Sequence, residues 1–166
     1  MLTAAKAASD RDWLMILVTY NHALRASETL AIVRDDLRSG HLDVRRLKGA
    51  LRTIQPLVEH SHPLLSERAA LLEHSRSLLN TQRLFPISRS AFWRLMQRHC
   101  ATAGIPEHKR HPHALKHTRC ALSMANKAGI ENVRQVAGHK SIASTGAYLR
   151  VSDSAAFAAV TAALKG

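Results

Sequence analysis

Polar residues in the C-terminal half of the sequence place the strongest constraint on its fold. Lys116 and His117 follow His113 by three and four positions, which is helical spacing. Gly138-His139 comes further along, and Tyr148 stands nine residues after that histidine. Tyrosine occurs only twice in the 166 residues, which makes a tyrosine just beyond a Gly-His turn a specific feature. These parts suffice for a catalytic centre that acts on phosphate groups.

Length and composition favour a single folded domain over residues 1–166. A chain of this length can bury a substantial core without disulfides or metal ions. Hydrophobic residues make up 46% of the sequence and charged residues 22%, a balance that excludes wholesale disorder. No apolar run approaches the roughly 18 residues that a membrane span requires. We therefore expect a soluble, cytoplasmic protein without a membrane partner.

The charge balance indicates a polyanionic partner. The sequence contains 24 Lys and Arg residues against 12 Asp and Glu residues, for a formal net charge of +12. An excess of this size favours binding to nucleic acid. The basic residues are spread over most of the chain, which suggests a charged face on a folded body rather than a basic tail.

Cysteine usage agrees with a reducing compartment. Cys100 and Cys120 are the only cysteines, and no long apolar segment follows Lys6 that would make a signal peptide. Both cysteines lie within helical patterns. We expect buried thiols rather than a nucleophile or a metal ligand.

The N-terminal third predicts two helices and a small sheet. Apolar residues at helical spacing predict a helix over residues 9–18, capped by Ser9 or Asp10. A second helix is expected over residues 27–33, capped by Ser27, with Glu28 in its first turn, where the helix dipole favours an acid.

Residues 41–45 and 51–57 alternate between apolar and polar side chains, which is typical of two antiparallel strands. Lys48-Gly49 between them predicts a hairpin tip. Pro56 indicates that the last strand lies at an edge or ends there.

Helical patterns dominate after Pro63. The expected fold class is therefore α+β, mostly α-helical with a small three-stranded antiparallel sheet. The expected helices cover residues 65–79, 88–102, 113–128, 131–137, 142–149 and an alanine-rich tail, 154–164.

The chemistry available to Tyr148 depends on nearby cations. A tyrosine hydroxyl can attack phosphorus, but with an ordinary pKa of roughly 10 it needs a base or positive charge to do so at neutral pH. Arginine suits the phosphate, because its planar fork donates two hydrogen bonds. A lysine on a hairpin tip suits the protonation of a departing 5′ oxygen.

In this order the residues resemble those of the tyrosine recombinases, the phage integrase family. The resemblance extends over residues 9–157, and residues 158–166 are then a tail helix. The segments that carry it are Ala23-Leu24-Arg25-Ala26-Ser27-Glu28, Lys48-Gly49, His113-Ala114-Leu115-Lys116-His117-Thr118 and Gly138-His139-Lys140-Ser141, with Tyr148.

The resemblance implies a division of roles. Tyr148 would be the nucleophile that forms a 3′-phosphotyrosyl link, Arg25 would clamp the scissile phosphate, and Lys48 would be the general acid. His113 and His139 would position the phosphate and assist proton transfer, and Glu28 and His117 would support the site. No metal and no other cofactor is implied. The expected activity is site-specific DNA recombination or integration, as in mobile elements.

Two departures from the family pattern stand out. Lys116 occupies the position of a second arginine, and lysine keeps the charge but loses the bidentate fork. This leaves open an alternative, a catalytically weakened or inactive DNA-binding protein on the same fold. We also expect no N-terminal DNA-clamping domain, because nothing before Ser9 is long enough to form one.

Other readings are less well supported by the sequence. His113 and His117 have the spacing of zinc ligands, but no third ligand at suitable spacing stands out. An RNA-binding helical module lacks an aromatic platform, since aromatic residues make up only 4% of the chain. The expected partners are double-stranded DNA and other copies of the chain, as a tetramer on paired sites, in a prokaryotic or phage setting near the nucleoid.

Overall fold

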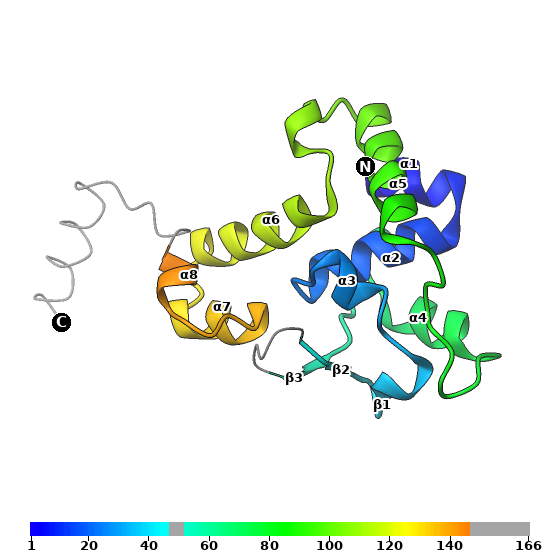
Figure 1. Ribbon diagram of the computed structural model, residues 1–166, viewed down its shortest axis with the longest axis horizontal. Coiled ribbons are helices and arrows are strands. Elements are labelled where there is room, and N and C mark those ends of the chain that lie inside the picture. The colour runs from blue at the N-terminus through cyan, green and yellow to red at the C-terminus, as the bar shows by residue number, and fades with distance from the viewer. Residues whose placement is uncertain (47–51, 147–166) are drawn as a thin grey trace, which may run out of the picture.

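The computed structural model describes residues 1–46 and 52–146, which are mostly helical (Figure 1). A single small sheet accompanies the helices in this part of the chain, so the expected α+β fold class is confirmed. Short 3-10 turns lie at Arg34–Asp36, Pro63–Leu65 and Glu107–Lys109. The helices are α1 (Leu2–Ala8), α2 (Asp10–Asn21), α3 (Ala26–Thr29), α4 (Arg68–Ser75), α5 (Arg89–Thr102), α6 (Pro112–Ala125), α7 (Ile130–Ala137) and α8 (Ala143–Gly146).

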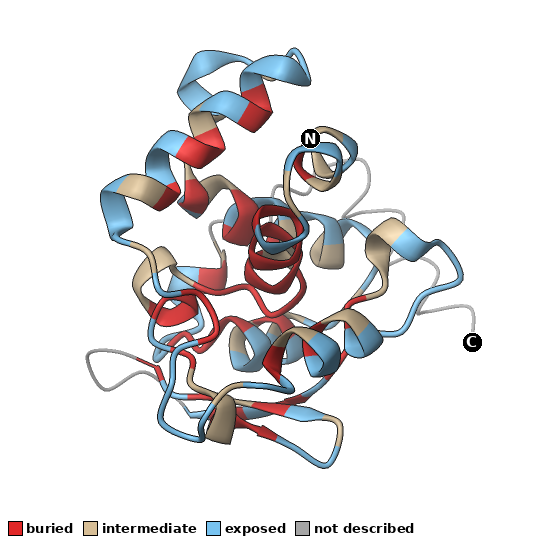
Figure 2. Cartoon of the chain, turned by 90° about the vertical axis from the view of Figure 1, so that its right-hand side faces the viewer, coloured by how far each residue is buried: buried red, intermediate tan, exposed pale blue. Residues whose placement is uncertain are grey.

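Helix α2 forms the centre of the core. Nine of its twelve residues are buried, and it packs against α1 and α6. The Ser9 hydroxyl accepts a hydrogen bond from the Asp12 amide, which confirms Ser9 as the cap. Figure 2 shows the buried residues gathered at the middle of the molecule and the exposed ones on the outer faces. Because His22, Ala23 and Leu24 are also buried, the loop after α2 leaves from inside the core.

The sheet has the strand order β1-β2-β3, all antiparallel. The strands are β1 (Leu37–Arg38), β2 (His41–Val44) and β3 (Thr53–Pro56). Leu42 faces Gln55, and Val44 faces Thr53. Strand β3 is an edge strand, as Pro56 predicted. The predicted tip at Lys48-Gly49 lies outside the described residues.

A buried polar network joins α2, β3 and α4. Glu67 is fully buried, and its carboxylate accepts hydrogen bonds from Asn21 Nδ2 at 3.0 Å and from the Val58 amide at 3.0 Å. His22 Nε2 lies 2.6 Å from the same carboxylate, and His22 Nδ1 lies 3.0 Å from Gln55 Oε1. A buried carboxylate needs such partners, so this network fixes the end of α2 against the sheet.

The second expected helix is shorter and begins earlier than predicted. Helix α3 spans Ala26–Thr29, and Arg25 occupies the cap position that we assigned to Ser27. The cause at its start is Glu28, whose carboxylate accepts a hydrogen bond from the Arg25 amide. The helix stops early because the chain extends at Ile32, whose carbonyl accepts a bond from the Leu84 amide, and Val33 bridges to Arg83.

Two further helix boundaries differ from the sequence prediction. The helix expected over residues 65–79 covers only Arg68–Ser75, and its start is late because Pro63–Leu65 form a 3-10 turn. Helix α1 was not predicted at all. The other boundaries agree within a few residues, and residue 147 onward lies outside the described part.

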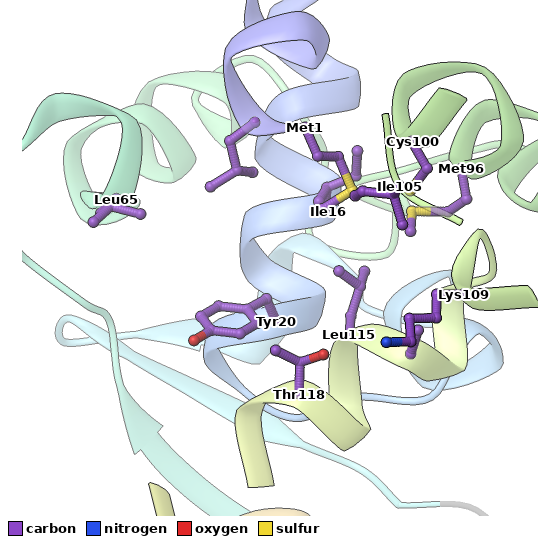
Figure 3. A pocket seen from close by; sticks show the side chains of 12 residues that line it. Met1, Ile16, Tyr20, Leu65, Met96, Cys100, Ile105, Lys109, Leu115 and Thr118 are labelled. Atoms are coloured by element: carbon purple, nitrogen blue, oxygen red, sulfur yellow. The ribbon is translucent and has the colours of Figure 1, made fainter. Parts of the chain in front are cut away.

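An apolar cavity of about 330 Å³ lies between α1, α2, α5 and α6. Figure 3 shows Met1, Ile16, Met96 and Cys100 among the side chains that line it. Cys100 and Cys120 are both buried, as expected, and burial raises the pKa of the Cys100 thiol. Over residues 1–46 and 52–146, no helix is long and apolar enough to cross a membrane.

Candidate active site

The loop between α2 and α3 presents Arg25 at the surface of the core. Glu28 holds it on both sides, because the Arg25 amide and Arg25 Nη1 donate to the two Glu28 carboxylate oxygens, each at 2.8 Å. The Glu28 side chain is only 1% exposed, whereas that of Arg25 is 40% exposed. Glu28 therefore orients the guanidinium while part of it stays accessible to a ligand.

Helix α6 supplies a histidine pair and a buried lysine. His111 caps the helix by accepting a hydrogen bond from the Ala114 amide. One turn later the rings of His113 and His117 meet edge to face, with centroids 4.2 Å apart, and both residues are exposed. Lys116 is 1% exposed, since its position on the helix faces the core.

The Lys116 ammonium donates hydrogen bonds to two backbone carbonyls. Its Nζ donates to Ala23 O at 3.0 Å and to Ala137 O at 2.5 Å. Ala23 precedes Arg25 by two residues, and Ala137 precedes His139 by two. Lys116 therefore joins the loop that carries Arg25 to the turn that carries His139.

The C-terminal end of α7 turns sharply to place His139. Gly138 has φ +66°, a left-handed conformation that ends the helix at no steric cost for glycine. His139 is 8% exposed, and a hydrogen bond of 2.9 Å joins its Nδ1 to Thr145 Oγ1 in α8. This bond fixes the ring orientation relative to the segment that leads to Tyr148.

The sequence prediction missed one buried cation, Arg46. Its side chain has no exposed area, and its guanidinium donates to Glu28 Oε2 at 2.9 Å. It also donates to the carbonyls of His22, Ala23 and Val136. A signal was present, because the alternation in β2 continues past Val44 and puts Arg46 on the same inward face as Leu42.

Burial and neighbouring charges shift the pKa values of the site. Burial, and then the charge of Arg46, lower the pKa of Lys116 to about 8. Burial, and then the charge of Lys116, lower the pKa of His139 to about 4. Burial opposes ionisation of Glu28, but the hydrogen bond from the Arg25 amide and the charge of Arg46 outweigh it and leave the pKa lowered.

The histidines of α6 are also shifted toward the neutral form. His113 is exposed as a residue, but partial desolvation of its ring lowers its pKa, and the charge of His117 adds to the effect. The pKa of His117 is lowered by burial and then by His111. At neutral pH these rings therefore act as hydrogen-bonding groups, while Arg25 provides fixed positive charge.

A basic hollow opens beside Arg25. It has a volume of about 260 Å³ and is bounded by the starts of α3, α5 and α6. Arg89, His111, His113 and the half-exposed Trp93 line it together with Arg25. A hollow of this charge, next to an accessible guanidinium, suits a phosphate or a nucleotide.

The structure brings six of the predicted residues into one region: Arg25, Glu28, His113, Lys116, His117 and His139. Lys116 links the two loops directly, and the charge of Arg25 contributes to the lowered pKa of both His113 and His139. Lys48 and Tyr148 lie outside the described residues. On either side of Lys48, β2 ends at Val44 and β3 begins at Thr53, and α8 ends at Gly146 before Tyr148.

Known proteins resemble this chain over most of its length. The model of the phage integrase family matches residues 1–155. The chain is 33% identical over 156 residues to the tyrosine recombinase XerD of Xanthomonas campestris, covering 85% of this chain and 48% of XerD. It is 30% identical over 161 residues to the type 1 fimbriae regulatory protein FimE of Escherichia coli K12, covering 92% of this chain and 80% of FimE.

Solved structures show the same fold. The XerA recombinase aligns with a TM-score of 0.74 and 24% identity, over 96% of this chain and 58% of XerA. The XerH site-specific recombinase, bound to its difH substrate, aligns with a TM-score of 0.76 and 17% identity, over 96% of this chain and 50% of XerH. The chain thus spans about half the length of XerD and XerH.

Proposed function

Because the chain belongs to the phage integrase family, we propose that it cuts and rejoins double-stranded DNA at specific sites through Tyr148. The observation that carries this proposal is the joint placement of Arg25 and His139, held by Lys116 through the carbonyls of Ala23 and Ala137. These residues stand far apart in the sequence. Only the fold brings them close enough for the charge of Arg25 to lower the pKa of His139.

The proposed reaction exchanges one phosphodiester for another. The Tyr148 hydroxyl gives its proton to a neutral histidine of the site, His113 or His139, and attacks the scissile phosphorus. The bond to the 5′ oxygen breaks, and Lys48 donates the proton that this oxygen takes up. A 3′-phosphotyrosyl bond results. Attack by a 5′ hydroxyl of another strand then releases Tyr148 and completes the joining. No metal, nucleotide or other cofactor takes part in these steps.

The described residues stabilise and orient the phosphate. Arg25 donates hydrogen bonds to the non-bridging oxygens, and Glu28 keeps its guanidinium in place. With a pKa of about 4, His139 is neutral at pH 7, so it accepts or donates a hydrogen bond without adding charge. His113 is exposed beside Arg25 and contacts the same phosphate, and His117 supports its ring.

A second function is favoured by one observation. The Lys116 ammonium is 1% exposed and directed at two carbonyls, so it contributes its charge to the phosphate without a direct contact. A protein with weaker phosphate stabilisation would bind DNA and cleave it slowly. The alternative is therefore a DNA-binding protein on the same fold with lapsed or reduced catalysis.

The partners follow from charge and from the reaction. The net charge of +12 suits duplex DNA, and strand exchange between two sites requires several protomers, which we propose to be a tetramer. The cytoplasm of a prokaryotic cell, at the nucleoid or on a mobile element, is the compartment where such a substrate is found. The tail helix expected over residues 158–166 lies outside the described residues and stays a prediction.

A nicked DNA substrate tests the function. When the protein cleaves next to the nick, the short strand that carries the new 5′ hydroxyl diffuses away. Without that hydroxyl the strand cannot be rejoined, so the covalent intermediate is trapped. A protein-DNA adduct that survives denaturing electrophoresis supports the recombinase. Salt-sensitive DNA binding without any adduct supports the alternative.

A further inference from the structure

We propose that Arg46 is a positioning residue of this site, which holds the Arg25 loop and the His139 turn at a fixed separation. The proposal deepens the function proposed above and rests on it. Arg46 lies just after β2 and touches neither Arg25 nor His139 through a hydrogen bond among the described residues. Its effect on a phosphate would pass through the backbone that carries both.

The first set of contacts is to the loop before α3. Arg46 Nη1 donates to Ala23 O at 3.2 Å and to Glu28 Oε2 at 2.9 Å, and Nη2 donates to His22 O at 3.2 Å. Glu28 uses its two oxygens on Arg25 as well. One guanidinium thus holds both the backbone ahead of Arg25 and the carboxylate that orients its side chain.

The second contact is to the C-terminal end of α7. Arg46 Nη2 donates to Val136 O, and Gln55 Nε2 donates to the same carbonyl at 3.1 Å. Lys116 donates to the next carbonyl, Ala137 O. The last carbonyls of a helix have no partner within the helix, so these side chains cap α7 immediately before Gly138-His139.

The backbone of the turn is fitted closely to Arg46. A Cβ atom at Gly138 would lie 2.7 Å from Arg46 Nε and 2.9 Å from Arg46 Cδ. Contacts this short do not occur between a real Cβ and its neighbours, so Arg46 packs where a side chain at residue 138 would be. The Arg46 side chain therefore packs directly against the backbone of the turn at Gly138.

Arg46 and Lys116 both connect the loop before α3 to the end of α7, but Arg46 makes more hydrogen bonds. Both donate to Ala23 O, and each reaches one of the last two carbonyls of α7. An ammonium donates from one point, whereas the guanidinium fork spans four acceptors in fixed directions. Arg46 therefore controls the orientation of the two segments relative to each other, and Lys116 adds a second hydrogen-bonded link at the adjacent carbonyl, Ala137 O.

Three variants separate positioning from general stability. Arg46→Gln removes the charge and most of the donors, and Arg46→Lys keeps the charge but cannot span the four acceptors. Arg45→Gln is the matched control, because Arg45 is the exposed neighbour and pairs with Asp36 at 3.0 Å away from the site. Each variant is first compared with the parent by thermal melting.

The main readout is the single-turnover rate constant for adduct formation on the nicked substrate, with DNA affinity measured in parallel. A misplacement of reacting groups by about 1 Å costs on the order of 10²-fold in rate. We expect Arg46→Gln to be slower by about 10- to 100-fold and Arg46→Lys to recover part of the loss. DNA affinity should stay within about twofold, and Arg45→Gln should match the parent. A purely structural role would lower the amplitude and the affinity and leave the rate constant of the folded fraction unchanged.

Hydrogen exchange provides a readout that does not depend on catalysis. The amides of Leu24, Gly138 and His139 are hydrogen-bonded within the two segments. In the Arg46 variants both segments should exchange about tenfold faster or more, together, and in Arg45→Gln neither should change. If the parent forms no adduct but the exchange pattern holds, the recombinase function fails and the positioning contact stands.

The opposite results overturn the positioning role. If the parent forms an adduct and both Arg46 variants cleave at the parental rate, or if the two segments exchange as in the parent, Arg46 does not position the site. If Arg46→Gln does not fold, Arg46→Lys decides between the same outcomes.

Discussion

Lys116 Nζ lies 2.5 Å from the carbonyl oxygen of Ala137, two residues before His139. Because the same ammonium also bonds to Ala23 O, one buried side chain connects the segment that carries Arg25 to the segment that carries His139. In the family pattern an arginine occupies this position. Here the lysine links two backbone segments, and in the function proposed above its charge contributes indirectly to phosphate stabilisation.

The first prediction concerns the pH dependence of this link. Lys116 has its pKa lowered to about 8 by burial and by Arg46, so the rate of cleavage should fall as pH rises through about 8 and the charge is lost. Lys116→Arg keeps its charge and should retain its pH 7 rate at pH 9. Single-turnover cleavage by parent and variant at both pH values measures this.

Charged and titratable groups around Lys116 can also affect the fall in cleavage rate at high pH. Equal loss of rate in parent and Lys116→Arg would assign the limb to another group and contradict the prediction. The charged and titratable neighbours are Arg25, Glu28, Arg46, His113, His117, Cys120 and His139.

The second prediction uses two glycines with the same backbone conformation. Gly138 has φ +66° and Gly104 has φ +67°, but a Cβ at residue 104 meets nothing within 4 Å. Both Gly→Ala variants carry the cost of a left-handed alanine, about 1–2 kcal/mol. Gly138→Ala should lose more stability in urea unfolding, since it also collides with Arg46, and should slow cleavage. Equal losses of stability in the two variants would mean that the Arg46 side chain moves aside at no cost, and would contradict the prediction.

The third prediction concerns acid stability. The pKa of His139 falls from an ordinary 6.5 to about 4 on folding, chiefly through burial. Between these values the unfolded chain binds the proton more tightly, so this histidine's contribution is complete above about pH 6.5 and is lost as pH falls toward 4. The stability gap between His139→Gln and the parent should therefore change between pH 7 and pH 5. His60→Gln, at an exposed site, is the control, and a gap that is constant with pH would be inconsistent with a depressed pKa.

Sequence patterns predicted the helices and strands better than they predicted the long-range contacts between them. The cap of residues 9–18 and the alternation of residues 41–45 and 51–57 reflect local rules, and α2, β2 and β3 follow them. Helix α3 was placed wrongly because the carboxylate of Glu28 and the long-range bonds of Ile32 set its ends. Arg25, His113 and His139 were predicted as site residues from their order, and the fold brings them into one region. Arg46 was missed because its four acceptors come from segments that only the fold brings together.

The fourth prediction concerns DNA affinity. With a net charge of +12, binding to duplex DNA should be dominated by phosphate contacts. Affinity should fall by about 10³-fold or more between 50 and 200 mM salt. Fluorescence anisotropy with a labelled duplex across this range measures the slope. Affinity that does not depend on salt would remove the basis for a phosphate-binding face.

The fifth prediction tests the central claim. Tyr148→Phe removes only the hydroxyl, so the protein should fold and bind DNA like the parent but form no covalent adduct with a nicked substrate. Denaturing gel electrophoresis of the reaction is the most direct measurement. The account predicts an adduct with the parent and none with Tyr148→Phe. An adduct that persists in Tyr148→Phe would place the nucleophile elsewhere and contradict the claim.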